Sequence, residues 1–186
     1  MTVERESMEV DVLFVGGGPA NLAAALHLKR LIEKHNEEVE NGTKQGEKFS
    51  DELMIGLIEK AQEIGLHGLS GGVMDKKALL EMFPDFDDSC GAVECKIDSE
   101  EVLMLTPSGK IKAPVTPPPL NNHGFYTVSL AKLTKWMAEQ VEAAGVDIFA
   151  GFPGVELLYE DSKVTGVRTG DKGLDQQGNP KSNFEP

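Results

Sequence analysis

Apolar and polar positions follow first a strand-like and then a helix-like pattern near the start of the chain. The run 10–15 (VDVLFV) is short, apolar and followed by glycines, which predicts a buried parallel strand. From Pro19 the apolar residues recur at helical spacing, and proline suits a first helical turn because an N–H there has no partner. The run 54–60 (MIGLIEK) predicts a second buried strand that ends in an acid. Together these elements form a βαβ unit, whose crossover is right-handed in nearly all proteins.

The later pattern predicts two helices, one more parallel strand and a hairpin. Asp75 is a candidate N-cap for a short helix that stops at Pro84. A long amphipathic helix at 130–144 precedes the strand VDIFAG, and a turn at Asp161-Ser162 joins two further strands as an antiparallel hairpin. A polar segment at about 34–52 is predicted to be the end of the first helix followed by a solvated insertion. A glycine-rich loop at 65–75 and a proline-rich excursion at about 85–124 are predicted to be irregular.

The turn between the first strand and the first helix reads GGGPAN, close to the dinucleotide-binding pattern G-x-G-x-x-G. In that pattern Gly16 makes the tight turn and Gly18 lets backbone N–H groups approach a pyrophosphate at the helix N-terminus. Asn21 replaces only the third glycine, which serves helix packing, so phosphate binding is retained. The predicted contacts of the turn with a dinucleotide are Gly16, Gly18, Pro19, Ala20 and Asn21.

Glu59 ends the second strand, where an acid that binds the adenosine ribose belongs. It lies 43 residues after Gly16 rather than about 20, and the polar insertion accounts for the excess. We include the next residue, Lys60, in the predicted site. An acid here disfavours a 2′-phosphate and therefore NADP.

The order of elements after the second strand favours FAD over NAD. Instead of further βα units, a glycine-rich loop, an irregular segment and a strand leading into a β-hairpin follow, as in flavoproteins of the glutathione-reductase type. Val155 opens that hairpin, where backbone groups would meet the adenine. We predict an α/β fold: a Rossmann-like FAD-binding domain with a parallel sheet and a β-hairpin layer, of which residues 1–186 are the N-terminal part.

Composition narrows the functional classes. A formal net charge of -13 argues against nucleic-acid binding, which needs a basic surface. Two cysteines, Cys90 and Cys95, are too few for an iron–sulfur or zinc site, so no metal ligand is predicted. The sequence shows no secretory signal and no apolar run long enough to span a bilayer. The polar ending after Gly170 predicts a truncated chain.

The longer motifs GGGPANLAAALHLKRL, LIEKAQEIGLHGLSGGVMD and NNHGFYTVSLAKLTKWMAEQVEAAGVDIFAGFPGVELLYED together resemble the electron-transfer flavoprotein–ubiquinone oxidoreductase family. The resemblance implies FAD, a 4Fe-4S cluster whose cysteine ligands are absent from this chain, and electron transfer from reduced electron-transfer flavoprotein to ubiquinone. It also implies that the loop 64–72 passes the isoalloxazine, which adds His67, Leu69, Ser70 and Gly71 to the predicted cofactor contacts. No catalytic residue is predicted, because electron transfer needs no proton-abstracting group.

The segment 102–120 resembles the part of that family that dips into one membrane leaflet, with apolar Val102–Leu105 at its tip. This implies a peripheral protein of the inner membrane, cytoplasmic or mitochondrial. A plain surface hairpin is the alternative. Two other functions stay open: a flavin-dependent monooxygenase, which would need a second glycine-rich site for NADPH, and a non-catalytic nucleotide-binding fragment.

Overall fold

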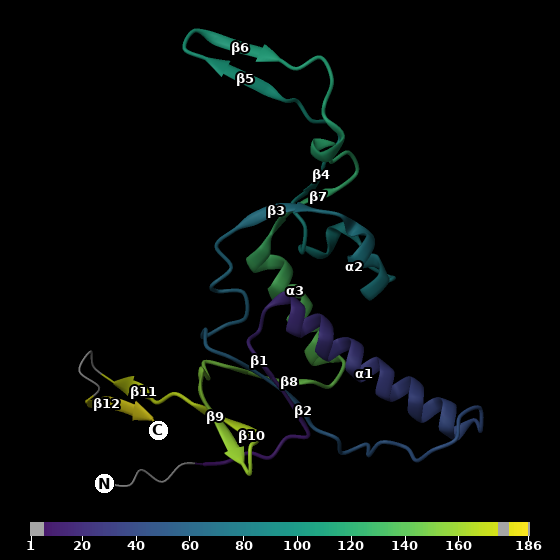
Figure 1. The fold of residues 1–186 in the computed structure, drawn as a ribbon, viewed down its shortest axis with the longest axis vertical. Coiled ribbons are helices and arrows are strands. Elements are labelled where there is room, and N and C mark those ends of the chain that lie inside the picture. Colours follow the sequence, from purple (N-terminus) through teal and green to yellow (C-terminus); the bar gives the residue numbers. More distant parts are fainter. Residues whose placement is uncertain (1–5, 175–178, 186) are drawn as a thin grey trace. The chain divides into compact units, whose positions relative to one another are not determined.

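A three-stranded parallel sheet carries the predicted dinucleotide turn (Figure 1). In the computed structural model, which describes residues 6–174 and 179–185, β1 (Val12–Val15) pairs with β2 (Ile55–Glu59), and β2 pairs with β8 (Asp147–Ala150). The order β1-β2-β8 reproduces half of the doubly wound strand order 3-2-1. The central strand β2 is buried from Ile55 to Ile58, as its unbroken apolar run predicts.

Helix α1 (Pro19–Glu40) connects β1 to β2 and buries Leu22, Ala25 and Leu26, which lie three and four residues apart on one face. The polar insertion that follows folds back on the helix. The Asn36 side chain donates to Phe49 O at 3.0 Å and accepts from Phe49 N at 2.8 Å. Part of the predicted insertion is therefore fixed to the helix by two hydrogen bonds between the Asn36 side chain and the Phe49 backbone.

The chain divides into two compact units, one made of Met1–His67 with Met137–Pro186 and the other of Gly68–Trp136. In the second unit β7 (Tyr126–Ser129) pairs antiparallel with β3 (Gly71–Met74) and with β4 (Cys95–Lys96). The prediction of a loop throughout 65–75 is thus wrong for 71–74. Glycine favours close strand approach here, because a Cβ on Gly71 would lie 2.8 Å from Val128 O.

Helix α2 (Lys76–Met82) begins where predicted: the Asp75 carboxylate accepts a hydrogen bond from Lys77 N at 3.0 Å. The predicted irregular excursion contains several short elements. These are η1 (Asp88–Cys90), β4, the hairpin of β5 (Leu103–Thr106) and β6 (Gly109–Lys112), and η2 (Pro118–Leu120). Short elements joined by proline-rich segments give little periodicity, which is why the pattern missed them.

Helix α3 (Leu130–Ala143) buries Leu133, Met137 and Val141, as its helical spacing predicts. After β8, the strands β9 (Gly154–Glu160) and β10 (Lys163–Thr169) form the predicted antiparallel hairpin. Its turn residues Asp161 and Ser162 have φ of 48° and 81°, the positive values of a tight hairpin turn. In the polar ending, β11 (Lys172–Leu174) pairs with β12 (Pro180–Glu185), while 175–178 and 186 lie outside the described residues.

Candidate functional site

The turn from β1 into α1 is built on three glycines with different surroundings. Gly16 has φ of 105°, which favours glycine, and its N–H donates to Ile58 O at the end of β2 at 2.7 Å. Gly17 is buried, and a Cβ there would lie 2.3 Å from Ile64 Cδ1. Gly18 is exposed, and a Cβ there would meet nothing within 4 Å. The turn is therefore packed against the sheet at Gly17 and open at Gly18.

The first turn of α1 offers backbone donors to a ligand. Gly18 is the N-cap, no side chain caps the helix, and Pro19 at the first helical position has no N–H. In the part of the chain that the structure describes, no hydrogen bond occupies the N–H groups of Gly18, Ala20 or Asn21. Such donors, at the positive end of a helix dipole and beside open space, fit a pyrophosphate.

Asn21 points its side-chain amide back at the turn. Its Nδ2 donates to Val15 O and to Gly16 O, each at 2.9 Å. The sequence identified Asn21 as a replacement for the packing glycine, but only the geometry shows that its side chain binds the two carbonyls before Gly17.

Glu59 closes the turn from the other strand. Its Oε2 accepts the Gly17 N–H at 2.6 Å and its Oε1 accepts the Ala61 N–H at 2.8 Å. Each carboxylate oxygen has about two acceptor positions, so one on each oxygen remains for a ribose hydroxyl. The carboxylate thus joins the glycine turn to the end of β2 and keeps the free acceptor positions that the predicted ribose contact needs.

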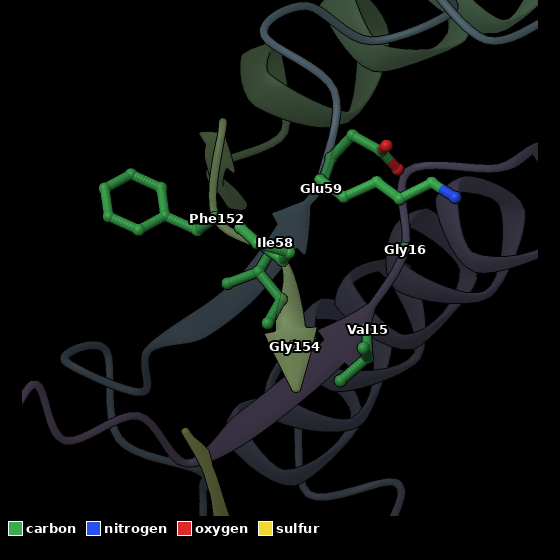
Figure 2. A pocket seen from close by; sticks show the side chains of 8 residues that line it. Val15, Gly16, Ile58, Glu59, Phe152 and Gly154 are labelled. Carbon is green, nitrogen blue, oxygen red and sulfur yellow. The ribbon is translucent and has the colours of Figure 1, made fainter. Parts of the chain in front are cut away.

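A cavity of about 170 Å³ opens beside this pair of strands. It is smaller than the roughly 300–1,000 Å³ of complete small-molecule sites, so it fits only part of a dinucleotide. Figure 2 shows the Glu59 side chain directed toward the segment that carries Gly16, with the Phe152 ring directed away from it. The lining residues are Val15, Gly16, Ile58, Glu59, Lys60, Phe152, Pro153 and Gly154.

Phe152 and Pro153 were missed by the sequence analysis. One residue, Gly151, separates them from the end of β8, and the carboxyl ends of parallel strands share one edge of the sheet, which is the signal that identifies them. Two backbone hydrogen bonds hold this segment at the site: Phe152 N donates to Glu59 O at 2.8 Å and Gly151 N to Ala61 O at 2.7 Å. Val155, which the sequence predicts as a contact, lies one residue after Gly154, the last residue that lines the cavity, and it is 59% exposed.

The structure brings together the turn residues, Glu59 and Lys60, all within the first unit. The predicted contacts on the loop 64–72 are divided between the units. His67 is exposed at the end of the first unit's N-terminal segment, whereas Leu69, Ser70 and Gly71 belong to the second unit. Leu69 is 96% exposed and Ser70 O accepts the Leu130 N–H at 3.0 Å. Their approach to a flavin stays a prediction.

Comparison with known proteins gives relatives along the whole chain. Electron transfer flavoprotein-ubiquinone oxidoreductase, mitochondrial, of Bos taurus is 38% identical over 187 residues, which is 100% of this chain and 28% of the relative. The protein of the same name from Caenorhabditis elegans is 41% identical over 182 residues, 97% of this chain and 28% of the relative. Along its whole length the chain is similar to part of the electron transfer flavoprotein-ubiquinone oxidoreductases. It spans 28% of the length of these relatives, and no protein-family model matches it.

Solved structures confirm the Rossmann-like α/β fold of this chain. A geranylgeranyl bacteriochlorophyll reductase-like protein of Thermoplasma acidophilum has a TM-score of 0.54 and 25% identity, covering 88% of this chain and 35% of its own. CtdE, solved in complex with FAD, has a TM-score of 0.52 and 17% identity, covering 87% of this chain and 35% of its own.

The hairpin at 103–112 and the two cysteines are the other features that the sequence singled out. The β5–β6 hairpin exposes Met104 by 69%, Leu105 by 78% and Ile111 by 60%. No described helix is long and apolar enough to cross a membrane. Among the described residues no group of three or more His, Cys, Asp or Glu is arranged to hold a metal ion, and Cys90 and Cys95 are free thiols.

Proposed function

We propose that this chain binds FAD and that the turn between β1 and α1 holds its pyrophosphate. One observation carries the proposal: the open N–H groups of Gly18 and Ala20 lie on the same turn whose Gly17 is bound by the Glu59 carboxylate. A dinucleotide needs both features within one site, donors for the phosphates and an acceptor for the ribose.

Each residue near the turn has a proposed part in that binding. Gly16, Gly18, Pro19 and Ala20 shape the phosphate end, while Glu59 accepts from the ribose hydroxyls. The exposed Lys60 and the backbone at Val155 border the adenosine end beside the cavity. From the family resemblance we propose that His67, Leu69, Ser70 and Gly71 pass the isoalloxazine as contacts. None of them is proposed as a catalytic residue.

When bound, FAD supplies one- and two-electron chemistry, and the protein supplies position and electrostatics. We propose that the complete protein is an electron-transferring-flavoprotein dehydrogenase, which passes electrons from reduced electron-transfer flavoprotein through FAD and a 4Fe-4S cluster to ubiquinone. The names and the 37–41% identity of the relatives support this. A 4Fe-4S cluster needs four thiolates, and this chain has two cysteines. Its own residues therefore do not fit the cluster, and the chain alone is expected to be inactive in the full reaction.

We further propose peripheral contact with the inner membrane, mitochondrial as in the relatives or cytoplasmic. The supporting feature is the β5–β6 hairpin, which exposes Met104 and Leu105 beside Lys110 and Lys112. An exposed apolar tip flanked by lysines suits the boundary between acyl chains and anionic headgroups.

The experiment that tests the function follows electrons. The complete protein is supplied with reduced electron-transfer flavoprotein and a ubiquinone analogue, and quinone reduction is recorded. Quinone reduction that requires the flavoprotein supports the proposal. Oxidation of NADPH with oxygen uptake would instead indicate the monooxygenase, and bound nucleotide without any turnover would indicate the non-catalytic fragment.

A further inference from the structure

The peptide unit between Gly16 and Gly17 is held at both ends by side chains. Its carbonyl oxygen, on Gly16, accepts from Asn21 Nδ2 at 2.9 Å. Its N–H, on Gly17, donates to Glu59 Oε2 at 2.6 Å. Rotating this peptide plane breaks both hydrogen bonds at once, so the two side chains fix its orientation together.

The side chain of Asn21 has no donor left for a ligand. A primary amide carries two N–H groups, and the two that Asn21 carries are given to Val15 O and Gly16 O, each at 2.9 Å. The remaining Oδ1 is an acceptor and does not attract a phosphate oxygen. A direct side-chain hydrogen bond from Asn21 to a pyrophosphate would require this arrangement to break.

The turn needs such a support because glycine backbones have wide conformational freedom. Three consecutive glycines precede Pro19, and Gly16 adopts a φ of 105°. In the sequence pattern G-x-G-x-x-G, close packing at the third glycine sets the helix against the strand. Here Asn21 occupies that position and instead binds the carbonyls at the end of β1 and the start of the turn.

We infer that Asn21 is a positioning residue: with Glu59 it fixes the Gly16–Gly17 peptide before the cofactor arrives, so that the N–H groups of Gly18 and Ala20 face the pyrophosphate. This rests on the proposed function, that the turn binds the pyrophosphate of FAD. A preformed turn loses less conformational entropy on binding, so the Asn21 side chain contributes to affinity without touching the ligand.

The test compares two probes in the protein and its N21A variant, with H27A on an exposed position of the same helix as the control. Adenosine reports the ribose end, and ADP adds the pyrophosphate. Calorimetry is expected to show ADP bound about tenfold more weakly by N21A, the equivalent of about one to two neutral hydrogen bonds, with adenosine changed by less than about twofold. Equal weakening of both probes, or unchanged ADP binding, overturns the inference.

A second readout does not depend on any ligand. Hydrogen exchange of the Gly17 amide in the ligand-free protein is expected to accelerate about tenfold in N21A, because the peptide loses its hold on the carbonyl side. The N21D variant is expected to show the same acceleration, because aspartate has nearly the shape of asparagine but no donor. Its negative charge favours the N-terminus of the helix, so folding is preserved. Unchanged Gly17 exchange in both variants contradicts the inference. If the unsubstituted protein binds ADP no better than adenosine, the proposed function fails. The exchange rate of the Gly17 amide in the two variants still tests whether Asn21 fixes the turn.

Discussion

Asn21 and Glu59 bind opposite ends of one peptide unit, the first donating to Gly16 O at 2.9 Å and the second accepting from Gly17 N at 2.6 Å. The two residues come from different elements, the first turn of α1 and the end of β2. The pair therefore couples the glycine turn to the sheet.

Replacing Glu59 tests the sheet side of this pair. In E59Q one of the two carboxylate oxygens becomes an amide NH2 group, which cannot accept from the backbone N–H that it faces. A charge-assisted hydrogen bond is therefore lost. We expect the free energy of unfolding in urea to fall by about 1.5–3 kcal/mol. The exposed E52Q is the control and is expected to change it by less than about 0.5 kcal/mol. A value for E59Q within that control range would contradict the contact.

Gly17 and Gly18 make a matched pair of substitutions with opposite expectations. In G17A the new Cβ would lie 2.3 Å from Ile64 Cδ1 and 3.3 Å from Glu59 Cβ. Such overpacking is expected to destabilise the fold by about 1–3 kcal/mol. In G18A the Cβ enters open space and φ is -80°, so the stability is expected to stay within about 0.5 kcal/mol.

The same G18A variant is expected to bind FAD at least about tenfold more weakly, because its methyl group occupies the approach of the pyrophosphate to the backbone. Thermal melts and FAD titrations of both variants check the two expectations separately. A G18A protein that binds FAD like the parent would show that the phosphates do not approach the turn at this position.

Tyr126 predicts a pH dependence in the second unit. It is 3% exposed, and its hydroxyl donates to the Asp88 carboxylate at 2.6 and 2.7 Å. This hydrogen bond, with burial and the negative charges of Asp88 and Asp87, raises the pKa of Tyr126. The folded protein then holds the tyrosine proton more tightly than the unfolded chain does. The resulting stability is complete below the ordinary tyrosine pKa of about 10 and is lost as the pH rises through the higher folded value.

Urea unfolding between pH 8 and 12 measures this effect. We expect the free energy of unfolding to decrease above a pH of about 10, and Y126F to remove the part of that decrease that comes from this residue. D88N supplies the complementary variant, since it removes the carboxylate and leaves the phenol. A decrease of the same size in the parent and Y126F would assign the effect to other groups.

The β5–β6 hairpin gives a prediction for membrane contact. Substituting its exposed tip in the M104D/L105D variant is expected to reduce cosedimentation with anionic phospholipid vesicles about tenfold or more, because two apolar side chains no longer enter the bilayer. V164D is the control, as it replaces another exposed apolar residue on β10. Equal binding by the parent and the tip variant would favour a plain surface hairpin.

The sequence predicts elements well where one period continues long enough to be recognised. The strands 12–15, 55–59 and 147–150 and the helices 19–40 and 130–143 all follow from apolar runs or helical spacing. Strand β3 escapes because Gly71 and Gly72 carry no side-chain pattern, and its pairing partner β7 lies far along the chain.

For the site, sequence motifs located the glycine turn and Glu59, but they could not supply its hydrogen bonds. The two contacts of Asn21 depend on where α1 starts relative to β1, which is a tertiary relationship. Phe152 likewise joins the cavity only because β8 pairs with β2. A ribose acid 43 residues after Gly16 was predictable only by treating the intervening polar residues as an insertion.

The central claim, that the turn between β1 and α1 binds the pyrophosphate of FAD, is tested most directly by titrating the protein with FAD and measuring affinity and stoichiometry from the change in flavin fluorescence. We predict one FAD per chain, weakened in G18A and not displaced by NADP. Absence of FAD binding, or FAD binding that is equal in the parent and G18A, would contradict the claim.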